Sequence, residues 1–423
     1  MSSARIAPWL LAPCVAFFVF LAVPWHGARA RALAEAGDGQ VDVREKPDGG
    51  APGASASAAL APPVAQPVLG AMTYDASLDR YVASFGHARA VLSVSPRLQQ
   101  GLEKLLASYR VPQGAAVLIE PRTGRVLALA EHDEKGSGGH VALRAIAPAA
   151  SIFKIVTSAA LLDRGIAPDS EVCFHGGKHR IQKLLLADDP RRDRRCLTLA
   201  SALGKSANVV FAKLAGRDLS AEILRAESKL FLFNAPIPFA WPVEPSPAEF
   251  SEDPFELATT AAGFGPVRMS PLHGALVAAL VANGGRFVPP RIVDEIDGVP
   301  APVPGEVRQA IRPEVAAALA YMMTTTVTEG TARKAFRRDR MARSSPLREV
   351  SVAGKTGSLS ERDPFRDYSW FVGFAPVDDP QIAVAAVVVN ERVWRVKAPF
   401  LAHEALKAYF AQDAARGVRT AAR

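Results

Sequence analysis

The chain has 423 residues, of which 49% are apolar and 22% charged, and its formal net charge is +8. These values are those of a globular protein with enough residues to bury a full core. Much of the positive charge lies in two runs, Arg191–Arg195 and Arg333–Arg348. Both runs are interrupted and lack an interleaved aromatic platform, so each is better interpreted as a solvated loop than as a nucleic-acid surface. We therefore expect no nucleic-acid partner.

The N-terminal residues are predicted to export the chain. Ile6–Trp25 is a continuous apolar run, and its 20 residues are enough to cross a bilayer as a helix. Ala28-Arg29-Ala30 also has the small-x-small pattern of a cleavage site, so residues 1–30 are a signal anchor or a cleaved signal peptide. We favour the anchor. Either alternative places the rest of the chain outside the cytoplasm, attached to a membrane or released from it.

Residues 31–75 are rich in Ala, Pro, Gly and Ser without any sustained period. Such a composition predicts a flexible linker. We expect order to begin near Leu78 and a single domain to occupy residues 76–415. Outside the anchor the cysteines are Cys173 and Cys196, and export removes the reducing environment. A disulfide that closes a surface loop is therefore expected, the alternative being two free thiols.

Short strands are predicted at both ends of this domain, with helices between them. The expected strands are 90–94, 115–120, 125–130, 352–358, 368–374 and 382–390, and the clearest helices begin at Pro96, Ser151 and Ala398. Ser95 and Pro96 have the pattern of a helix N-terminus, and Gly165 that of a helix end. This order predicts an α+β fold in which a largely antiparallel five-stranded sheet is covered by helices.

The first of three motifs is Ser151-Ile152-Phe153-Lys154. Residues three apart share a helix face, so the amine of Lys154 is expected near the hydroxyl of Ser151. A serine becomes a good nucleophile only beside a base, and lysine is a base only when it is neutral. Burial, a helix N-terminus and a second cation all lower a lysine pKa, and a shift from about 10.4 to near 7 costs roughly 4–5 kcal/mol. SxxK alone occurs by chance in many helices.

The second motif is Ser206-Ala207-Asn208. The hydroxyl of Ser206 is a candidate to relay a proton between Lys154 and a leaving amine. The amide of Asn208 is a candidate to hold a substrate carbonyl. Taken alone, this motif is equally consistent with a helix cap and a polar neighbour.

The third motif is Lys355-Thr356-Gly357-Ser358, on a predicted strand. Lys355 would supply the second cation, and the hydroxyls of Thr356 and Ser358 would hydrogen-bond a terminal carboxylate. Gly357 lets a substrate lie against the strand edge. The backbone N–H groups of Ser151 and Ser358 would together stabilise an oxyanion. Alone, the motif is also consistent with an ordinary strand that has a polar end.

The three motifs in this order resemble those of penicillin-binding proteins and the related serine β-lactamases. From about Ala90 to Phe410 the chain is similar to the penicillin-binding-protein transpeptidase family, including the segments AAVLIEPRTGRVLALA and YSWFVGFAP. The resemblance implies that Ser151 attacks the penultimate D-Ala carbonyl of a peptidoglycan stem peptide. D-Ala then leaves, and an amine of a neighbouring stem peptide takes the acyl group. β-Lactams are the implied inhibitors, and no cofactor or metal is implied.

The chain also departs from the family pattern. Ala149-Ala150 precede the nucleophile where Pro-Gly is usual, and Phe264 stands where a Gln is common. No glycosyltransferase domain fits before residue 90, and the pedestal domain of the monofunctional members is missing or reduced to residues 76–110. A separate membrane glycosyltransferase is a candidate partner by resemblance, and these departures argue against the family's standard role beside one. The histidines show neither metal-ligand spacing nor a partnered Asp, so surface or loop positions are expected. Trp370 is expected in the core beneath the third motif.

Three alternatives remain open from the sequence. A D,D-carboxypeptidase differs only in using water as the acyl acceptor. A serine β-lactamase of class A needs a Glu that positions the deacylating water, and no ExxLN-like segment lies between Asn208 and Lys355. A non-catalytic lactam or muropeptide sensor, or a scaffold, is less consistent with three intact motifs.

Overall fold

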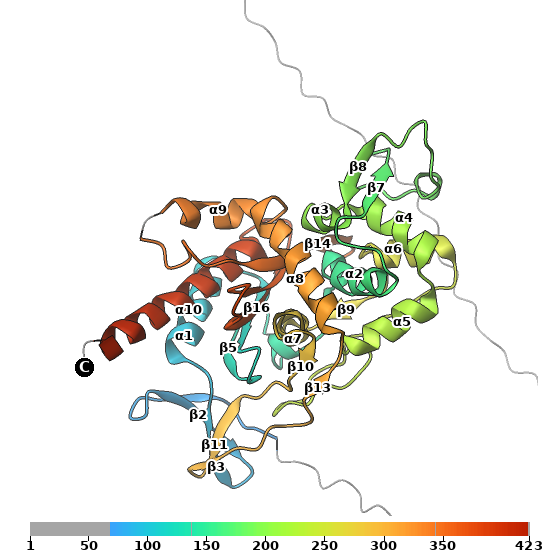
Figure 1. Cartoon of the computed structure of the whole chain (residues 1–423). Coiled ribbons are helices and arrows are strands. Elements are labelled where there is room, and N and C mark those ends of the chain that lie inside the picture. Colours follow the sequence, from blue (N-terminus) through green and yellow to red (C-terminus); the bar gives the residue numbers. More distant parts are fainter. Residues whose placement is uncertain (1–67, 137, 343, 422–423) are drawn as a thin grey trace, which may run out of the picture. The chain divides into compact units, whose positions relative to one another are not determined.

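The computed structural model describes residues 68–421, with gaps at 137 and 343. Its main sheet has five strands in the order β14-β15-β16-β4-β5, and every neighbouring pair is antiparallel (Figure 1). The strands are β4 (Gln113–Ile119), β5 (Val126–Asp133), β14 (Ala353–Arg362), β15 (Phe365–Ala375) and β16 (Ile382–Asn390). The predicted fold, an α+β arrangement around a five-stranded antiparallel sheet, is confirmed.

Helices cover both faces of this sheet, because successive side chains of a strand point to opposite sides. One face packs against α1 (Pro96–Ser108) and α10 (Ala398–Ala421). Its buried side chains include Ala116, Leu118, Phe371, Val384 and Val388. The other face packs against α7 (Pro271–Ala282). Its buried side chains include Ala115, Val117, Val372, Ala385 and Val387.

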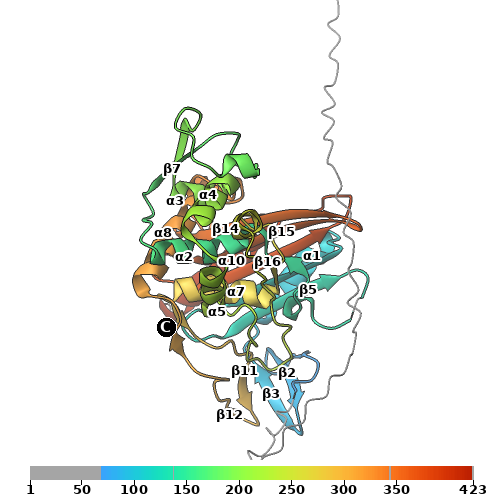
Figure 2. The ribbon, with the colours of Figure 1, turned by 90° about the vertical axis from the view of Figure 1, so that its right-hand side faces the viewer.

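The remaining helices gather at the β14 edge of the sheet and beyond it (Figures 1 and 2). These elements are η2 (Ala150–Phe153), α2 (Lys154–Asp163), α3 (Leu199–Gly204), α4 (Asn208–Asp218), α5 (Ala221–Leu230), α6 (Pro254–Ala261), α8 (Pro313–Thr328) and α9 (Arg333–Met341). The short η1 (Val141–Leu143) instead packs against β4, β5 and α7. None of the helices within the described part of the chain is long and apolar enough to cross a membrane.

A second, smaller sheet has the order β1-β2-β3-β11-β12 and lies below the main one in Figure 2. Its strands are β1 (Thr73–Asp75), β2 (Arg80–Phe85), β3 (Ala88–Leu92), β11 (Val293–Ile296) and β12 (Val299–Pro300). Two-residue strands complete the structure: β6 (Ala147–Pro148) pairs with β9 (Arg268–Met269), and β10 (Arg286–Phe287) with β13 (Arg308–Gln309).

The predicted C-terminal limit of the linker at residue 75 is wrong. Leu69 is only 3% exposed, its N–H donates to the carbonyl of Ala240 at 3.1 Å, and its carbonyl accepts from Nε1 of Trp241 at 2.6 Å. Composition did not reveal these contacts because the partners lie some 170 residues away. The proposed signal segment 1–30 and the rest of the linker, 31–67, lie outside the described residues.

Two further expectations need correction. The basic run 333–348 is not all loop: α9 forms within it because Phe336 and Ala332 are buried in the apolar core. Nor are all the histidines on the surface, since His273 is fully buried with Nε2 at 2.6 Å from the carbonyl of Phe231. His175 does have an aspartate partner, Asp193, which lies 18 residues along the chain and so formed no local pattern.

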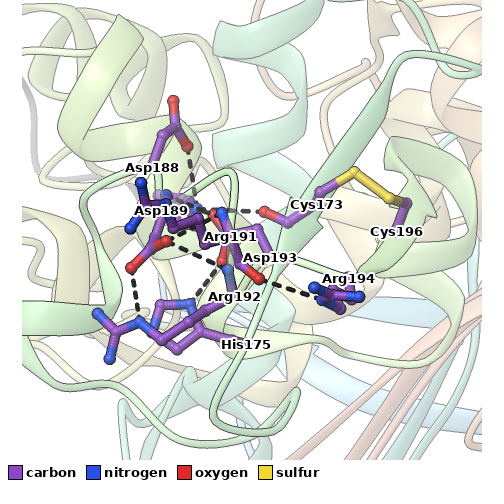
Figure 3. A network of polar contacts seen from close by, with 10 residues as sticks. Cys173, His175, Asp188, Asp189, Arg191, Arg192, Asp193, Arg194 and Cys196 are labelled. Atoms are coloured by element: carbon purple, nitrogen blue, oxygen red, sulfur yellow. Dashed lines mark hydrogen bonds and ion pairs between the residues drawn. A yellow bond between two sulfur atoms is a disulfide. The ribbon is translucent and has the colours of Figure 1, made fainter.

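A disulfide joins Cys173 of β7 (Glu171–Phe174) to Cys196 of β8 (Arg195–Thr198), which pair in antiparallel register. We call residues 174–195 the disulfide loop; it includes η3 (Lys183–Leu185). Figure 3 shows that this loop is organised around the carboxylate of Asp193.

The carboxylate of Asp193 accepts hydrogen bonds from Nζ of Lys213 at 2.7 Å and from the N–H of Asp189 at 2.9 Å, and it lies 2.5 Å from Nδ1 of His175. Burial opposes ionisation of this group, but these contacts hold the pKa of Asp193 below its ordinary range. Lys213 belongs to α4, and its amine also donates to the carbonyl of Cys173 at 3.1 Å. The loop is therefore attached to α4 as well as closed by the disulfide.

Replacing Lys213 with methionine should lower the free energy of unfolding at pH 7 by about 3 kcal/mol, because it leaves a buried carboxylate without its cation. The side chains of Lys213 and Asp193 are only 3% and 7% exposed. Urea denaturation followed by circular dichroism measures the change. Lys183→Met removes an exposed lysine of the same loop and should stay within about 0.5 kcal/mol of wild type. Equal effects of the two substitutions would contradict a structural role for the pair.

Candidate active site

The nucleophile candidate Ser151 lies in a tight 3₁₀ turn, η2, that leads directly into α2. The helix predicted from residue 151 therefore begins as a 3₁₀ turn, which is narrower than an α-helix. Ala150 has φ 48°, a left-handed conformation that is uncommon for residues other than glycine. The backbone of Gly263 crosses this turn so closely that a Cβ atom there would lie 2.4 Å from the carbonyl oxygen of Ala150. The same atom would lie 2.9 Å from the nitrogen of Ser151.

The amine of Lys154 joins three separate parts of the chain. Nζ donates to Oγ of Ser151 at 2.8 Å, to Oδ1 of Asn208 at 3.0 Å and to the carbonyl of Ala262. These contacts use all three hydrogens of an ammonium group, although the first also allows a neutral amine to accept from the serine. Lys154 has no exposed surface, so its orientation is set entirely by the protein.

A second buried amine lies at the same site. Lys355 on β14 has no exposed surface, and its Nζ donates to Oγ of Ser206 at 3.0 Å and to the carbonyl of Thr356 at 2.7 Å. Ser206 lies between α3 and α4 with φ 52°, which turns the chain sharply just before Asn208 begins α4. The first, second and third motifs are thus linked through the pairs Ser151–Lys154, Lys154–Asn208 and Ser206–Lys355.

Burial and mutual repulsion favour the neutral form of these amines. Burial first, and then the positive charge of Lys355, hold the pKa of Lys154 well below its usual value. Burial alone lowers the pKa of Lys355 to about 7. Both effects favour a neutral amine on Lys154, beside the hydroxyl of Ser151.

Strand β14 is an edge of the main sheet, so the side of the strand away from β15 is not paired within the sheet. Gly357 lies close to the nucleophile turn: an added Cβ would be 3.2 Å from the Ile152 side chain and 3.3 Å from the carbonyl of Ala149. Trp370 on β15 is fully buried behind Gly357, and its Nε1 donates to the carbonyl of Pro148 at 2.9 Å. The expected core position of Trp370 is confirmed.

Two hydroxyls of the third motif face the open part of the site. Thr356 is half-buried, with Oγ1 at 2.5 Å from Oγ1 of Thr331, and Ser358 is exposed. A nucleophile, a buried base and an edge strand that carries hydroxyls and a cation are together suited to acyl transfer.

A family model described as the penicillin binding protein transpeptidase domain matches residues 114–406, more than half of the chain. The chain belongs to this family. Over 346 residues it is 28% identical to the peptidoglycan D,D-transpeptidase PbpA of Mycobacterium tuberculosis, an alignment that covers 70% of this chain and 66% of PbpA. The chain therefore spans slightly less than two thirds of the length of that relative.

Solved structures share the fold of this penicillin-binding-protein domain. The D,D-transpeptidase domain of a peptidoglycan glycosyltransferase from Eggerthella lenta has a TM-score of 0.64 and 23% identity, covering 82% of this chain and 99% of that one. An imipenem acyl-enzyme complex of penicillin-binding protein A from M. tuberculosis has a TM-score of 0.59 and 25% identity, covering 75% and 78%. These likenesses support the family assignment made from the motifs.

Asn208 has two partners in the penicillin-binding-protein site that its motif did not reveal. Its Oδ1 accepts from Lys154, and its Nδ2 donates to the carbonyl of His179 at 2.9 Å, while the residue is only 6% exposed. In this structure Asn208 positions the lysine. The contacts of Ala262, Thr331 and His179 were missed, because two involve backbone carbonyls and none lies within a motif.

Phe264, the residue that stands where a Gln is common, is 48% exposed at the rim. The centre of its ring lies 5.9 Å from Nζ of Lys154, and the centre of the buried Phe211 ring lies 5.6 Å from the same atom. Phe264 therefore adds an apolar wall beside the amine and removes no contact that the amine uses.

Gly263→Ala should lower the free energy of unfolding by at least about 2 kcal/mol, because the substitution adds a clash with the nucleophile turn and strains a residue at positive φ. Gly263 has φ 92°. Urea denaturation provides the measurement. Gly101→Ala in α1 is the matched control: nothing lies within 4 Å of the added Cβ, so the variant should gain up to about 1 kcal/mol of stability. A neutral Gly263→Ala variant would show that the turn moves freely.

Proposed function

We propose that the chain is a D,D-transpeptidase that cross-links peptidoglycan stem peptides through an acyl-serine intermediate on Ser151. The observation that carries the proposal is the fully buried amine of Lys154, 2.8 Å from the Ser151 hydroxyl and with its pKa well below normal. An amine with these properties has no evident use in a surface helix or a binding module. The similar protein PbpA of M. tuberculosis is a peptidoglycan D,D-transpeptidase, which agrees with the proposal.

In the first half-reaction, Lys154 takes the proton of Ser151 while Oγ attacks the penultimate D-Ala carbonyl of a stem peptide. The backbone N–H groups of Ser151 and Ser358 stabilise the oxyanion that forms. The amide bond between the two D-Ala residues then breaks. Ser206 gives its proton to the leaving amine and is reprotonated by Lys355, to which its hydroxyl is hydrogen-bonded at 3.0 Å.

In the second half-reaction an amine of a neighbouring stem peptide attacks the ester. Its proton returns along Ser206 to Lys355, while Lys154 returns a proton to Oγ of Ser151 as the ester bond breaks. The product is a new amide bond and a free enzyme. Until D-Ala leaves, Lys355 and the hydroxyls of Thr356 and Ser358 hold the terminal carboxylate of the donor peptide, and Asn208 positions Lys154 in both half-reactions.

The structure also bears on the alternatives. The polar partners of Lys154 among the described residues are Ser151, Asn208 and the carbonyl of Ala262, with no carboxylate that would activate a deacylating water. This arrangement favours a long-lived acyl-enzyme over β-lactam hydrolysis. A carboxypeptidase would use the same residues with water as the acceptor. We place the domain in the periplasm, held to the inner membrane by residues 1–30, with a membrane glycosyltransferase as partner.

Fluorescent penicillin should form a covalent adduct with the full-length protein, because a β-lactam acylates the same serine as the stem peptide. Gel fluorescence and intact mass measure the adduct, and peptide mapping locates it. We expect it on Ser151, with a lifetime of minutes or more, and none in Ser151→Ala. A signal that clears within seconds would indicate a β-lactamase. No adduct on a folded protein would favour a sensor or scaffold.

Lys355→Met should move the pH profile of acylation toward higher pH. The charge of Lys355 lowers the pKa of Lys154, so its removal raises that pKa, and the neutral base is then reached only at more alkaline pH. The measurement is the second-order rate constant of penicillin acylation between pH 5 and 10. Lys205→Met, at the end of α3, is the control and should keep the wild-type midpoint. An unshifted midpoint in Lys355→Met would remove Lys355 from the tuning of Lys154.

A further inference from the structure

The disulfide loop borders the active site directly. The carbonyl of His179 accepts from Nδ2 of Asn208 at 2.9 Å, and the carbonyl of Lys178 accepts from the N–H of Val209 at 3.2 Å. Asn208 itself contacts the amine of Lys154. Residues 178–180 therefore form a rim on the active site, connected to Lys154 by two hydrogen bonds through Asn208.

This rim carries positive charge that the loop does not neutralise. Lys178 and Arg180 are exposed, and neither forms an ion pair with any residue that the structure describes. The guanidinium of Arg180 lies 2.7 Å from the side-chain amide of Gln182, which is a neutral partner. Both cations remain available to an anionic ligand.

The acidic residues of the loop are already engaged elsewhere. Asp188 and Asp193 pair with Lys213, and Asp189 pairs with Arg192 (Figure 3). The carboxylates of the loop are thus paired, whereas Lys178 and Arg180 keep their charge beside the active site. Unpaired cations next to a site raise the positive potential there.

The side chain of His179 lies within reach of these positive charges. Its pKa is lowered first by burial and then by the charge of Lys178, with smaller effects from Lys154 and Lys355. The cations of the rim and the buried amines of the site therefore act on the same small region.

The rim is held in place before any ligand binds. The disulfide closes the loop, and Lys213 joins it to α4. The Val209 N–H and the Asn208 side-chain amide donate to the carbonyls of residues 178 and 179, which fixes these residues against the start of the same helix. A ligand that contacts the rim has little backbone entropy to remove, so exposed cations there are worth more than cations on a mobile loop.

We propose that Lys178 and Arg180 determine substrate specificity by binding a free carboxylate of the stem peptide, outside its C-terminal D-Ala. Lys355, Thr356 and Ser358 are assigned to the terminal carboxylate, so the rim acts on a different group of the substrate. The enzyme then prefers stem peptides with free carboxylates to those in which they are carboxamides. The inference rests on the proposed function.

The test compares two pentapeptides that end in D-Ala-D-Ala and differ only in whether their internal carboxylates are free or amidated. Each competes with fluorescent penicillin for Ser151 of the full-length protein, and the concentration that halves the labelling rate is measured. We expect the free-carboxylate peptide to be effective at about a tenfold lower concentration, about threefold for each exposed cation. The preference should fall as NaCl is raised from 0.05 to 0.5 M.

Lys178→Gln and Arg180→Gln should each reduce the preference about threefold, and the double variant should abolish it. Lys183→Gln removes a lysine of the same loop that has no contact with Asn208 or Val209, and it should keep the wild-type preference. If penicillin labels the protein and the two peptides slow the labelling equally, or neither slows it, the specificity role is overturned and the acyl-serine chemistry is left intact. Absence of labelling overturns both proposals.

Discussion

The buried amine of Lys154 is the point on which the site depends. It holds the nucleophile turn through Ser151, the start of α4 through Asn208 and the end of α6 through the carbonyl of Ala262. A buried polar group that loses its partners costs about 1–3 kcal/mol, and more if it is charged. Displacement of any one of the three segments therefore weakens the others, and the site is assembled as a unit.

Two lysines without solvent contact cannot both be ammonium ions at little cost. The structure reduces the cost by giving each amine fixed acceptors. The two amines also contact different serines: Lys154 contacts Ser151, and Lys355 contacts Ser206. In the proposed mechanism, this division lets one amine act as the base for the nucleophile while the other supplies charge and a proton. The edge position of β14 brings Lys355 to the site without using the sheet's internal hydrogen bonds.

Close backbone packing provides the rigidity that such a site needs. Gly263 leaves no room for a side chain beside Ala150, and Gly357 none for a large one beside Ile152. On the other side of α4, the ion pair between Lys213 and Asp193 attaches the disulfide loop. The same helix thus positions the base at its first turn and the basic rim through the loop that it holds.

The sequence by itself determined the sheet and the chemistry. The apolar runs of β15 and β16 and the turn between β4 and β5 are local signals, because strand periodicity and turn residues act over a few positions. The residues of the candidate site stood out for the same reason, since each motif is short and its spacing places functional groups on one side of an element. They are Ser151, Lys154, Ser206, Asn208, Lys355 and Thr356.

What the tertiary structure decided lies in contacts between distant segments. The Ala262 carbonyl, the Asp193 partner of His175 and the contacts of Leu69 with 240–241 have no local pattern, because a backbone carbonyl or a loop carboxylate looks alike wherever it occurs. The partners of Asn208 show the same limit: its spacing predicted an amide at the site, but only the fold directs that amide to Lys154 and to His179. Residue types follow from the sequence, whereas their partners follow from packing.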